Sequence, residues 1–428
     1  MLKNLAVSVV ALVSLVSISP AAGNFDASGL EKSPGAANFV ADWFPAPVEA
    51  PAPEKDWTIM VFINGKNNLE KYALRDINEM EMIGSSDRVN VVVEAGRIEG
   101  YDASDGDWKG VRRYLIQKDA NPAAVTSPVV QDLGKVDMGD YRSVIDFGKW
   151  AKTAYPARKT MLIIWNHGAG WTKSRKTSVV TRGISYDDET NNHINTPQMA
   201  AILKEMGGVD IYGSDACLMQ MAEVIYEIKD FAGFIVGSEE TEPGDGYTYN
   251  TFLAPLVSDP GMSAEAFARV AVDSYSDHYK AQKEGSTQSY IRTSAIPGFL
   301  AMVDDFAFVT AMAGEKAIVK QALASAQSYA YPANKDLYHF AQLVTAGSAD
   351  PAVKENGAAL MAYIETELVG YNRTNNGAGD DSDPPSDYSR SHGIAVYLPP
   401  SAPSAGYDAL RWAKDSNWYE FIKWYQRP

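Results

Sequence analysis

The fold of this chain is decided by two stretches, MLIIWNHGAGW at residues 161–171 and VDIYGSDACLM at residues 209–219. Each begins as an apolar run and is followed by a reactive side chain, His167 in the first and Cys217 in the second. Continuous apolar runs are typical of strands in a parallel sheet, which presents reactive groups beyond the carboxyl ends of its strands. Fifty positions (217 minus 167) separate the two residues, enough for a crossover helix. We therefore expect His167 and Cys217 to meet at one edge of the sheet, on neighbouring parallel strands.

Strand and helix patterns alternate around these two stretches. Further strands are expected at 57–64, 88–96, 111–117 and 233–240, and helices at 69–83, 141–154, 196–206 and 218–230. The last of these helices would begin immediately after Cys217. Such alternation predicts an α/β fold with right-handed crossovers and a mostly parallel sheet.

Four segments of the chain differ in composition. Residues 1–23 carry a basic residue, an apolar run and small residues, which is typical of an export signal. Residues 24–55 are rich in Ala and Pro and predict a linker or pro-segment. Residues 56–258 hold the alternating pattern, and residues 259–428 are mainly helical with one late strand at 392–399. No apolar stretch reaches the roughly 20 residues that span a bilayer. We expect an exported protein, located in the periplasm, on the cell surface or outside the cell, without membrane insertion.

Net charge and cysteine content narrow the classes of function. The formal charge of −16 argues against nucleic acid and anionic membranes as partners, because both require clustered Lys and Arg. It favours basic substrates only weakly, since an acidic exported protein is also simply soluble. The single cysteine cannot form an internal disulfide, so Cys217 is either a small buried hydrophobe or a free thiol with a function.

The two strand ends carry the residues that nucleophilic catalysis needs. A thiol is a strong nucleophile as its thiolate, which a nearby imidazole or a helix N-terminus promotes. Both are expected beside Cys217. Gly168 has no side chain, so its N–H and that of Cys217 are candidates for an oxyanion hole in acyl transfer. The alternative is that a lone His or Cys at a strand end is structural.

Three motifs are similar to those of a known family. The strings WNHGAGW, DACLM and GSEETEPGDGYTYN resemble the clostripain family of cysteine peptidases, which is related to caspases, legumains and gingipains. The resemblance covers residues 56–258 well and the C-terminal part loosely. It implies a caspase-like α/β/α sandwich in which Cys217 is the nucleophile and His167 the general acid/base. No cofactor is implied for the chemistry itself.

The same resemblance implies cleavage after Arg or Lys, with carboxylates in the S1 pocket that receives this side chain. The matching positions are Asp215, two residues before the cysteine, and Asp245 in the PGDGY turn. The chemistry agrees, because a buried carboxylate needs a cationic partner and Arg binds it through two hydrogen bonds. For Asp245 the alternative is an ordinary position in a Gly-Asp-Gly turn.

Members of the family are often zymogens that cut themselves in a loop after the histidine. Here the corresponding loop, 172–183, contains four basic residues: Lys173, Arg175, Lys176 and Arg182. We expect self-cleavage in this loop, after Arg182 in particular, because ordered structure resumes just beyond it. A solvated basic loop has the same composition.

Calcium is a further candidate, because some members of the family use it. Carboxylates that are candidate ligands occur at Asp187, Asp188, Glu239 and Glu240 and in the segment 380–387, without the spacing of an EF-hand. Acidic loops of this kind are usually solvated.

Together these observations predict an exported cysteine endopeptidase that acts on proteins or peptides with basic residues. One alternative is a non-catalytic secreted protein of the same fold that binds basic segments. Another is a peptidase of the same fold that prefers a different residue before the cleaved bond.

Overall fold

The computed structural model describes residues 53–171, 183–379 and 384–427. These described residues form one compact unit. The expected export signal at 1–23 lies outside the described residues, as does the expected linker up to residue 52.

A nine-stranded sheet forms the centre of this unit. Its five central strands are parallel, and antiparallel strands extend it at both edges. The predicted α/β fold with a mostly parallel sheet is therefore confirmed. In order across the sheet the strands are β12 (Val369–Asn375), β10 (Ser286–Arg292), β9 (Ala232–Gly237), β8 (Val209–Asp215), β5 (Ala157–Trp165), β1 (Lys55–Gly65), β2 (Val89–Arg97), β3 (Gly110–Leu115) and β4 (Val129–Gly134).

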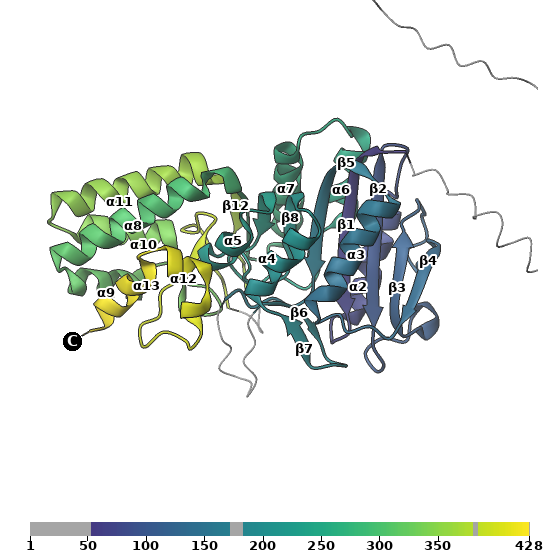
Figure 1. Ribbon diagram of the computed structural model, residues 1–428, viewed down its shortest axis with the longest axis horizontal. Helices are drawn as coiled ribbons and strands as arrows, with labels where there is room; N and C mark the ends of the chain where they lie inside the picture. The colour runs from purple at the N-terminus through teal and green to yellow at the C-terminus, as the bar shows by residue number, and fades with distance from the viewer. Residues whose placement is uncertain (1–52, 172–182, 380–383, 428) are drawn as a thin grey trace, which may run out of the picture. The chain divides into compact units, whose positions relative to one another are not determined.

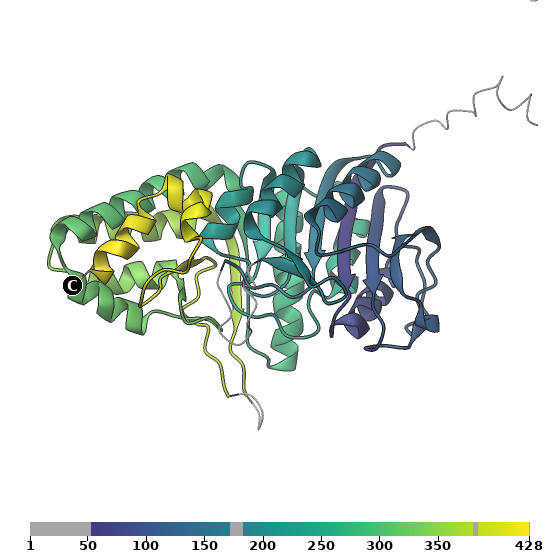
Figure 2. The ribbon, with the colours of Figure 1, turned by 60° about the horizontal axis from the view of Figure 1, so that its bottom comes forward.

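Helices cover both faces of the sheet, as Figure 1 and Figure 2 show. Strand β1 explains the two layers, because successive side chains of a strand point to opposite faces. Its Met60 and Phe62 belong to one core, whereas Ile59 and Val61 belong to the other. One face carries α3 (Tyr141–Ala154), α4 (Thr196–Glu205) and α5 (Ala222–Ile228), and the other carries α2 (Glu70–Glu81), α6 (Tyr249–Ser258) and α7 (Ala264–Gln282).

The C-terminal helices gather beyond the β12 edge of the sheet (Figure 1). They are α8 (Ile296–Ala313), α9 (Lys316–Ser325), α10 (Leu337–Gly347), α11 (Pro351–Tyr363), α12 (Arg411–Asp415) and α13 (Trp418–Gln426). The predicted boundary after residue 258 does not separate two compact bodies, because β10 and β12 lie beyond it and extend the central sheet. The late strand is shorter than the predicted 392–399. It is β13 (Ala395–Tyr397), which pairs with β11 (Asn334–Asp336) in a separate small sheet.

One C-terminal helix departs from the expectation that no later stretch is long and apolar enough to cross a membrane. By length and composition alone, Thr293–Ala313 meets that test. A core helix of a globular protein meets it too. Ile296, Phe299 and Val303 of this helix are buried in the core, while Met312 on its other side is exposed.

Candidate active site

The structure brings His167 and Cys217 to the same sheet edge. Strands β5 and β8 are parallel neighbours, and their last residues, Trp165 and Asp215, lie opposite each other. His167 and Cys217 each follow two residues later. The predicted placement on neighbouring parallel strands is confirmed. Both side chains line a cavity of about 190 Å³, together with Leu69, Asp215, Glu242 and Gly246.

The backbone after Cys217 differs from the prediction. Helix α5 begins at Ala222 and not directly after the cysteine, so the predicted helix N-terminus does not follow the thiol. Leu218 has a left-handed backbone (φ 64°), which interrupts a helix. Its N–H donates to the Glu240 carbonyl at 3.0 Å, and the Gln220 N–H donates to the Ser238 carbonyl at 3.0 Å. This pairing with a distant segment overrides the helical pattern of the sequence.

Burial makes the resting thiol and imidazole neutral. It raises the pKa of Cys217 to about 11, and the nearby charge of Glu242 raises it further. Burial also lowers the pKa of His167, against the opposing effect of Asp188. Near pH 7 the pair is therefore a thiol and a neutral imidazole, and the thiol proton has to move when the sulfur attacks.

Gly168 holds its backbone directly against that of Cys217. A Cβ at position 168 would lie 2.5 Å from the Cys217 carbonyl oxygen, so only glycine fits. Gly168 lies opposite Ile184 in an isolated antiparallel bridge, and the flanking hydrogen bonds join Ala169 to Gly183 and His167 to Ser185. In an antiparallel pair the backbone N–H of the intervening residue points away from its partner. The two amides predicted for the oxyanion hole thus lie on backbone segments in contact.

The imidazole of His167 is held by a residue that the sequence did not reveal. Nε2 of His167 lies 2.7 Å from Oδ1 of Asn68, which follows strand β1. Asn68 and His167 are 99 positions apart. In the sequence Asn68 stands in the string NNLE at 67–70, where no local pattern indicates a contact with His167.

Asp215, one of the two predicted pocket carboxylates, lines the cavity and is buried. Its oxygens accept hydrogen bonds from the Tyr247 N–H (3.1 Å) and the Tyr249 hydroxyl (2.8 Å). Burial nevertheless raises the pKa of Asp215 to about 7. Gly246 covers the carboxylate in a left-handed turn (φ 58°), where a Cβ would lie 2.6 Å from Oδ1 of Asp215.

A second carboxylate in the cavity is Glu242, which the sequence analysis did not single out. Both of its carboxylate oxygens are buried, and among the described residues they lie against the Asp215 carboxyl and the Ala216 N–H. Burial and the charge of Asp215 raise the pKa of Glu242 well above its usual value. A third acidic residue, Asp76, accepts a hydrogen bond from Trp165 Nε1 at 2.6 Å. Burial and the charge of Asp215 raise the pKa of Asp76 as well. This group carries acidic side chains without an ion-paired lysine or arginine among the described residues.

Asp245, the other predicted pocket carboxylate, points elsewhere. It is not among the residues lining the cavity. Its carboxylate lies 2.5 Å from Arg75 Nη1 and 3.1 Å from His278 Nε2. Although burial acts in the opposite direction, hydrogen bonds from Gln282 and Arg75 hold the pKa of Asp245 below its usual value.

The candidate cleavage positions Lys173, Arg175, Lys176 and Arg182 lie outside the described residues. The two ends of their loop are described and are joined. The Gly183 N–H donates to the Gly170 carbonyl at 3.1 Å, and the Ala169 N–H donates to the Gly183 carbonyl at 2.9 Å.

The candidate calcium ligands are engaged within the protein. Asp187 accepts from the Met138 N–H at 2.9 Å, Glu239 accepts from the Tyr329 hydroxyl at 2.8 Å, and Asp188 lies 3.3 Å from the Tyr101 hydroxyl. Residues 380–383 of the acidic segment lie outside the described residues. Across residues 53–171, 183–379 and 384–427, no group of three or more His, Cys, Asp or Glu side chains is placed to hold a metal ion.

Comparison with known proteins relates this geometry to one family. The family model described as the clostripain family matches residues 61–425. Clostripain from Hathewaya histolytica is 29% identical over 229 residues, which cover 49% of this chain and 43% of that protein. The matched region thus spans less than half of the relative.

Two solved structures share the fold. A secreted C11 cysteine protease from Bacteroides thetaiotaomicron, in complex with an irreversible peptide inhibitor, has a TM-score of 0.65 at 20% identity, covering 85% of this chain and 99% of that one. An inactive zymogen C11 protease from Parabacteroides distasonis has a TM-score of 0.62 at 18% identity, covering 87% of this chain and 99% of that one.

Proposed function

We propose a function from one premise: this chain belongs to the clostripain family. The protein is an exported cysteine endopeptidase that cleaves proteins or peptides after Arg or Lys. One observation carries the proposal. Asp215 and the carboxylate oxygens of Glu242 are buried in the cavity that His167 and Cys217 line, and no ion pair to either carboxylate is present among the described residues. A cationic side chain of a substrate supplies the missing charge.

Cys217 and His167 perform the acyl transfer. As Sγ attacks the carbonyl carbon of the substrate, His167 takes the thiol proton, and the oxyanion receives hydrogen bonds from the Gly168 and Cys217 amides. His167 then gives the proton to the leaving amine. Water hydrolyses the resulting thioester with His167 as the base. The nucleophile and the proton carrier are both side chains, so this sequence of steps requires no cofactor.

The S1 pocket selects a basic residue because the two carboxylates that line the pocket ionise at low cost only when a cation lies beside them. Burial raises the pKa of both Asp215 and Glu242. A guanidinium or ammonium group between them favours the ionised forms, and a neutral side chain leaves them without a partner. Asp245 lies at the margin of this site, where it is paired with Arg75.

Self-cleavage in the loop 172–183, after Arg182 in particular, activates the protein. The hydrogen bonds of Gly183 with Gly170 and Ala169 hold the two ends of the loop together. Strand β5 precedes the loop and pairs with β8, which follows it. A single cut therefore leaves two associated fragments. Mass spectrometry under denaturing conditions should show two chains for the purified protein and one for Cys217→Ala, and the same single chain in both would contradict self-cleavage.

Activity against a reporter peptide with Arg before the cleaved bond tests the proposed function. Cys217→Ala and His167→Ala should each abolish its hydrolysis, and a covalent inhibitor directed by Arg should label Cys217 in the wild-type chain. Turnover that is unchanged in either variant would refute the assignment. Binding of basic peptides without labelling or hydrolysis would identify the protein as a non-catalytic binder instead.

A further inference from the structure

The imidazole of His167 has one hydrogen bond recorded in the described structure, and it goes to a side-chain amide. Nε2 of His167 lies 2.7 Å from Oδ1 of Asn68. An amide oxygen has lone pairs but no proton, so it can only accept. Nε2 must therefore carry the hydrogen in this arrangement, and the lone pair of the neutral ring is on Nδ1.

Asn68 is exposed, but the backbone that carries it is fixed. The neighbouring Asn67 is buried; its Nδ2 donates to the Tyr186 carbonyl at 2.8 Å, and its Oδ1 accepts from the Leu69 N–H at 2.9 Å. Asn64, at the end of β1, donates to the Ser185 hydroxyl at 3.1 Å. A hydrogen bond from such a rigid segment orients its partner at a low entropic cost.

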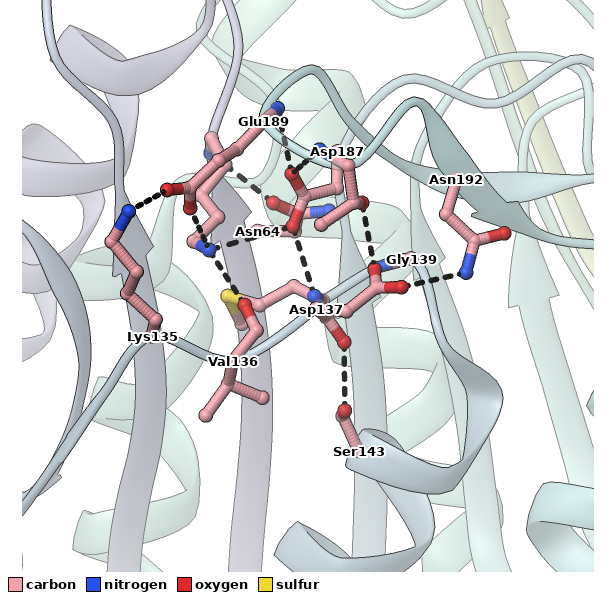
Figure 3. A network of polar contacts seen from close by, with 12 residues as sticks. Asn64, Lys135, Val136, Asp137, Gly139, Ser143, Asp187, Glu189 and Asn192 are labelled. Carbon is pink, nitrogen blue, oxygen red and sulfur yellow. Dashed lines mark hydrogen bonds and ion pairs between the residues drawn. The ribbon is translucent and has the colours of Figure 1, made fainter.

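The polar network shown in Figure 3 extends this anchoring. It connects Asn64 to Asp187 through Lys66, whose N–H donates to Asn64 Oδ1 at 3.1 Å and whose ammonium lies 3.6 Å from Asp187. The Asn68 loop and strand β6 (Ile184–Asp187) are thus tied to each other. The Ser185 N–H of that same strand donates to the His167 carbonyl at 3.3 Å. The side chain and the backbone of His167 are therefore held by two segments, the Asn68 loop and strand β6, that are bonded to each other.

We propose that Asn68 is a positioning residue that holds His167 in the tautomer with hydrogen on Nε2, so that Nδ1 is the nitrogen that takes the proton of Cys217 and gives it to the leaving amine. The inference rests on the proposed function, because it assigns a nitrogen to that proton transfer. The neutral amide differs from a carboxylate in this role. It fixes the ring without stabilising the imidazolium, so the resting ring stays neutral and available as a base.

Nitrogen-15 NMR of the full chain reads the tautomer directly. The sequence has five histidines, and the His167 signals are those that disappear in His167→Ala. With Cys217→Ala in all samples, so that the chain stays uncut, His167 should be in the Nε2–H tautomer. Adding Asn68→Ala should produce a mixture of both tautomers. Asn68→Asp, which keeps an acceptor oxygen, should restore the single tautomer. Asn356→Ala on α11, far along the chain from the site, is the control and should change nothing.

Kinetics with Cys217 present separate a positioning role from a structural one. Asn68→Ala should lower kcat by about 10-fold to 100-fold with little change in KM, because a misplaced imidazole loses part of the roughly 100-fold to 10,000-fold that acid–base catalysis contributes. Asn68→Asp should recover part of kcat and move the acidic limb of the pH profile to higher pH, because a carboxylate stabilises the imidazolium. An Nδ1–H tautomer in the parent chain, or an Asn68→Ala variant with unchanged kcat, would overturn the inference. A wild-type chain without peptidase activity would refute the proposed function. The tautomer measurement would still decide whether Asn68 determines the tautomer of His167.

Discussion

Two buried charge clusters near the active site differ in whether they contain a cation. In the first, Lys66 lies 2.7 Å from Glu189 and 3.6 Å from Asp187, and Figure 3 shows these carboxylates among their hydrogen-bond donors. In the second, Asp215 and Glu242 face the catalytic cavity without an ion pair in the described chain. Both clusters follow the ends of strands. Only in the first does a cation of the described chain pair with the carboxylates.

The difference separates a structural charge cluster from one that serves a ligand. Buried ions are stable when opposite charges and hydrogen bonds surround them, as they do around Lys66. An unbalanced buried carboxylate instead retains its proton until a cation arrives, which is the state that the raised pKa of Asp215 describes. If this distinction holds, substitutions in the first cluster affect mainly stability, and those in the second affect mainly substrate selection.

Removing the cation of the balanced cluster should have the largest effect. Lys66→Met leaves Asp187 as a buried charge without its cation, which costs about 3–5 kcal/mol of unfolding free energy. Urea denaturation in a Cys217→Ala background measures the loss. The matched control is Lys135→Met, because Lys135 also pairs with Glu189 but its side chain is 88% exposed. A loss in Lys66→Met no greater than in the control would show that the cluster is not structural.

Neutralising the unbalanced cluster should change substrate selection. Asp215→Asn keeps the shape of the side chain and removes the charge that receives the basic residue of the substrate. Losing one partner of such a buried pair costs about 2–5 kcal/mol, or roughly 30-fold to several thousand-fold in kcat/KM for an Arg reporter. Unfolding free energy should fall little, because an amide is less costly to bury than a charge. Equal losses of kcat/KM with Arg and neutral reporters would show that Asp215 does not bind the basic side chain of the substrate.

The raised pKa of Asp215 predicts how the preference for Arg depends on pH. With a pKa of about 7 in the empty pocket, the carboxyl is mostly protonated below pH 7 and a bound cation has to displace that proton. The ratio of kcat/KM for Arg to that for a neutral reporter should fall up to about tenfold for each pH unit below 7. Taking the ratio cancels the titration of His167. In Asp215→Asn the ratio should depend less steeply on pH, because only Glu242 then titrates in the pocket, and a flat ratio in the wild type would contradict the prediction.

The smallest effect should come from Asp245. Its partner Arg75 is about half exposed, with 47% of its side chain accessible, and exposed ion pairs contribute about 0–1 kcal/mol. Asp245→Asn should therefore change kcat/KM for the Arg reporter by less than about fivefold. A loss comparable to that of Asp215→Asn would place Asp245 in the pocket after all, in the role that the family resemblance implies.

The centre of the fold was predictable because its strands are apolar and alternate with amphipathic helices. The strands toward the edges of the sheet could not be predicted in this way. Strand β10 has the sequence STQSYIR, whose polar residues are buried and bonded to other segments; the Ser289 hydroxyl, for example, accepts from Gln220 Nε2 at 3.0 Å. Strand β4 is largely exposed and carries no core face. Hydrophobic periodicity detects neither kind of strand.

The site was predictable only where strand ends determine it. His167, Cys217 and Asp215 all lie at or just beyond the ends of β5 and β8, which the apolar runs locate. Asn68 and Glu242 are brought in by loops from other parts of the chain, and no local pattern records such contacts. The helix expected directly after Cys217 failed for the same reason, since residues 218–221 pair with a distant segment.

The burial of Cys217 also bears on the chemical durability of the protein. Peroxides and disulfides react with thiolates far faster than with thiols. With a thiol pKa of about 11, only about one molecule in ten thousand carries the thiolate at pH 7. The reactive sulfur is therefore shielded from adventitious oxidation until a substrate arrives.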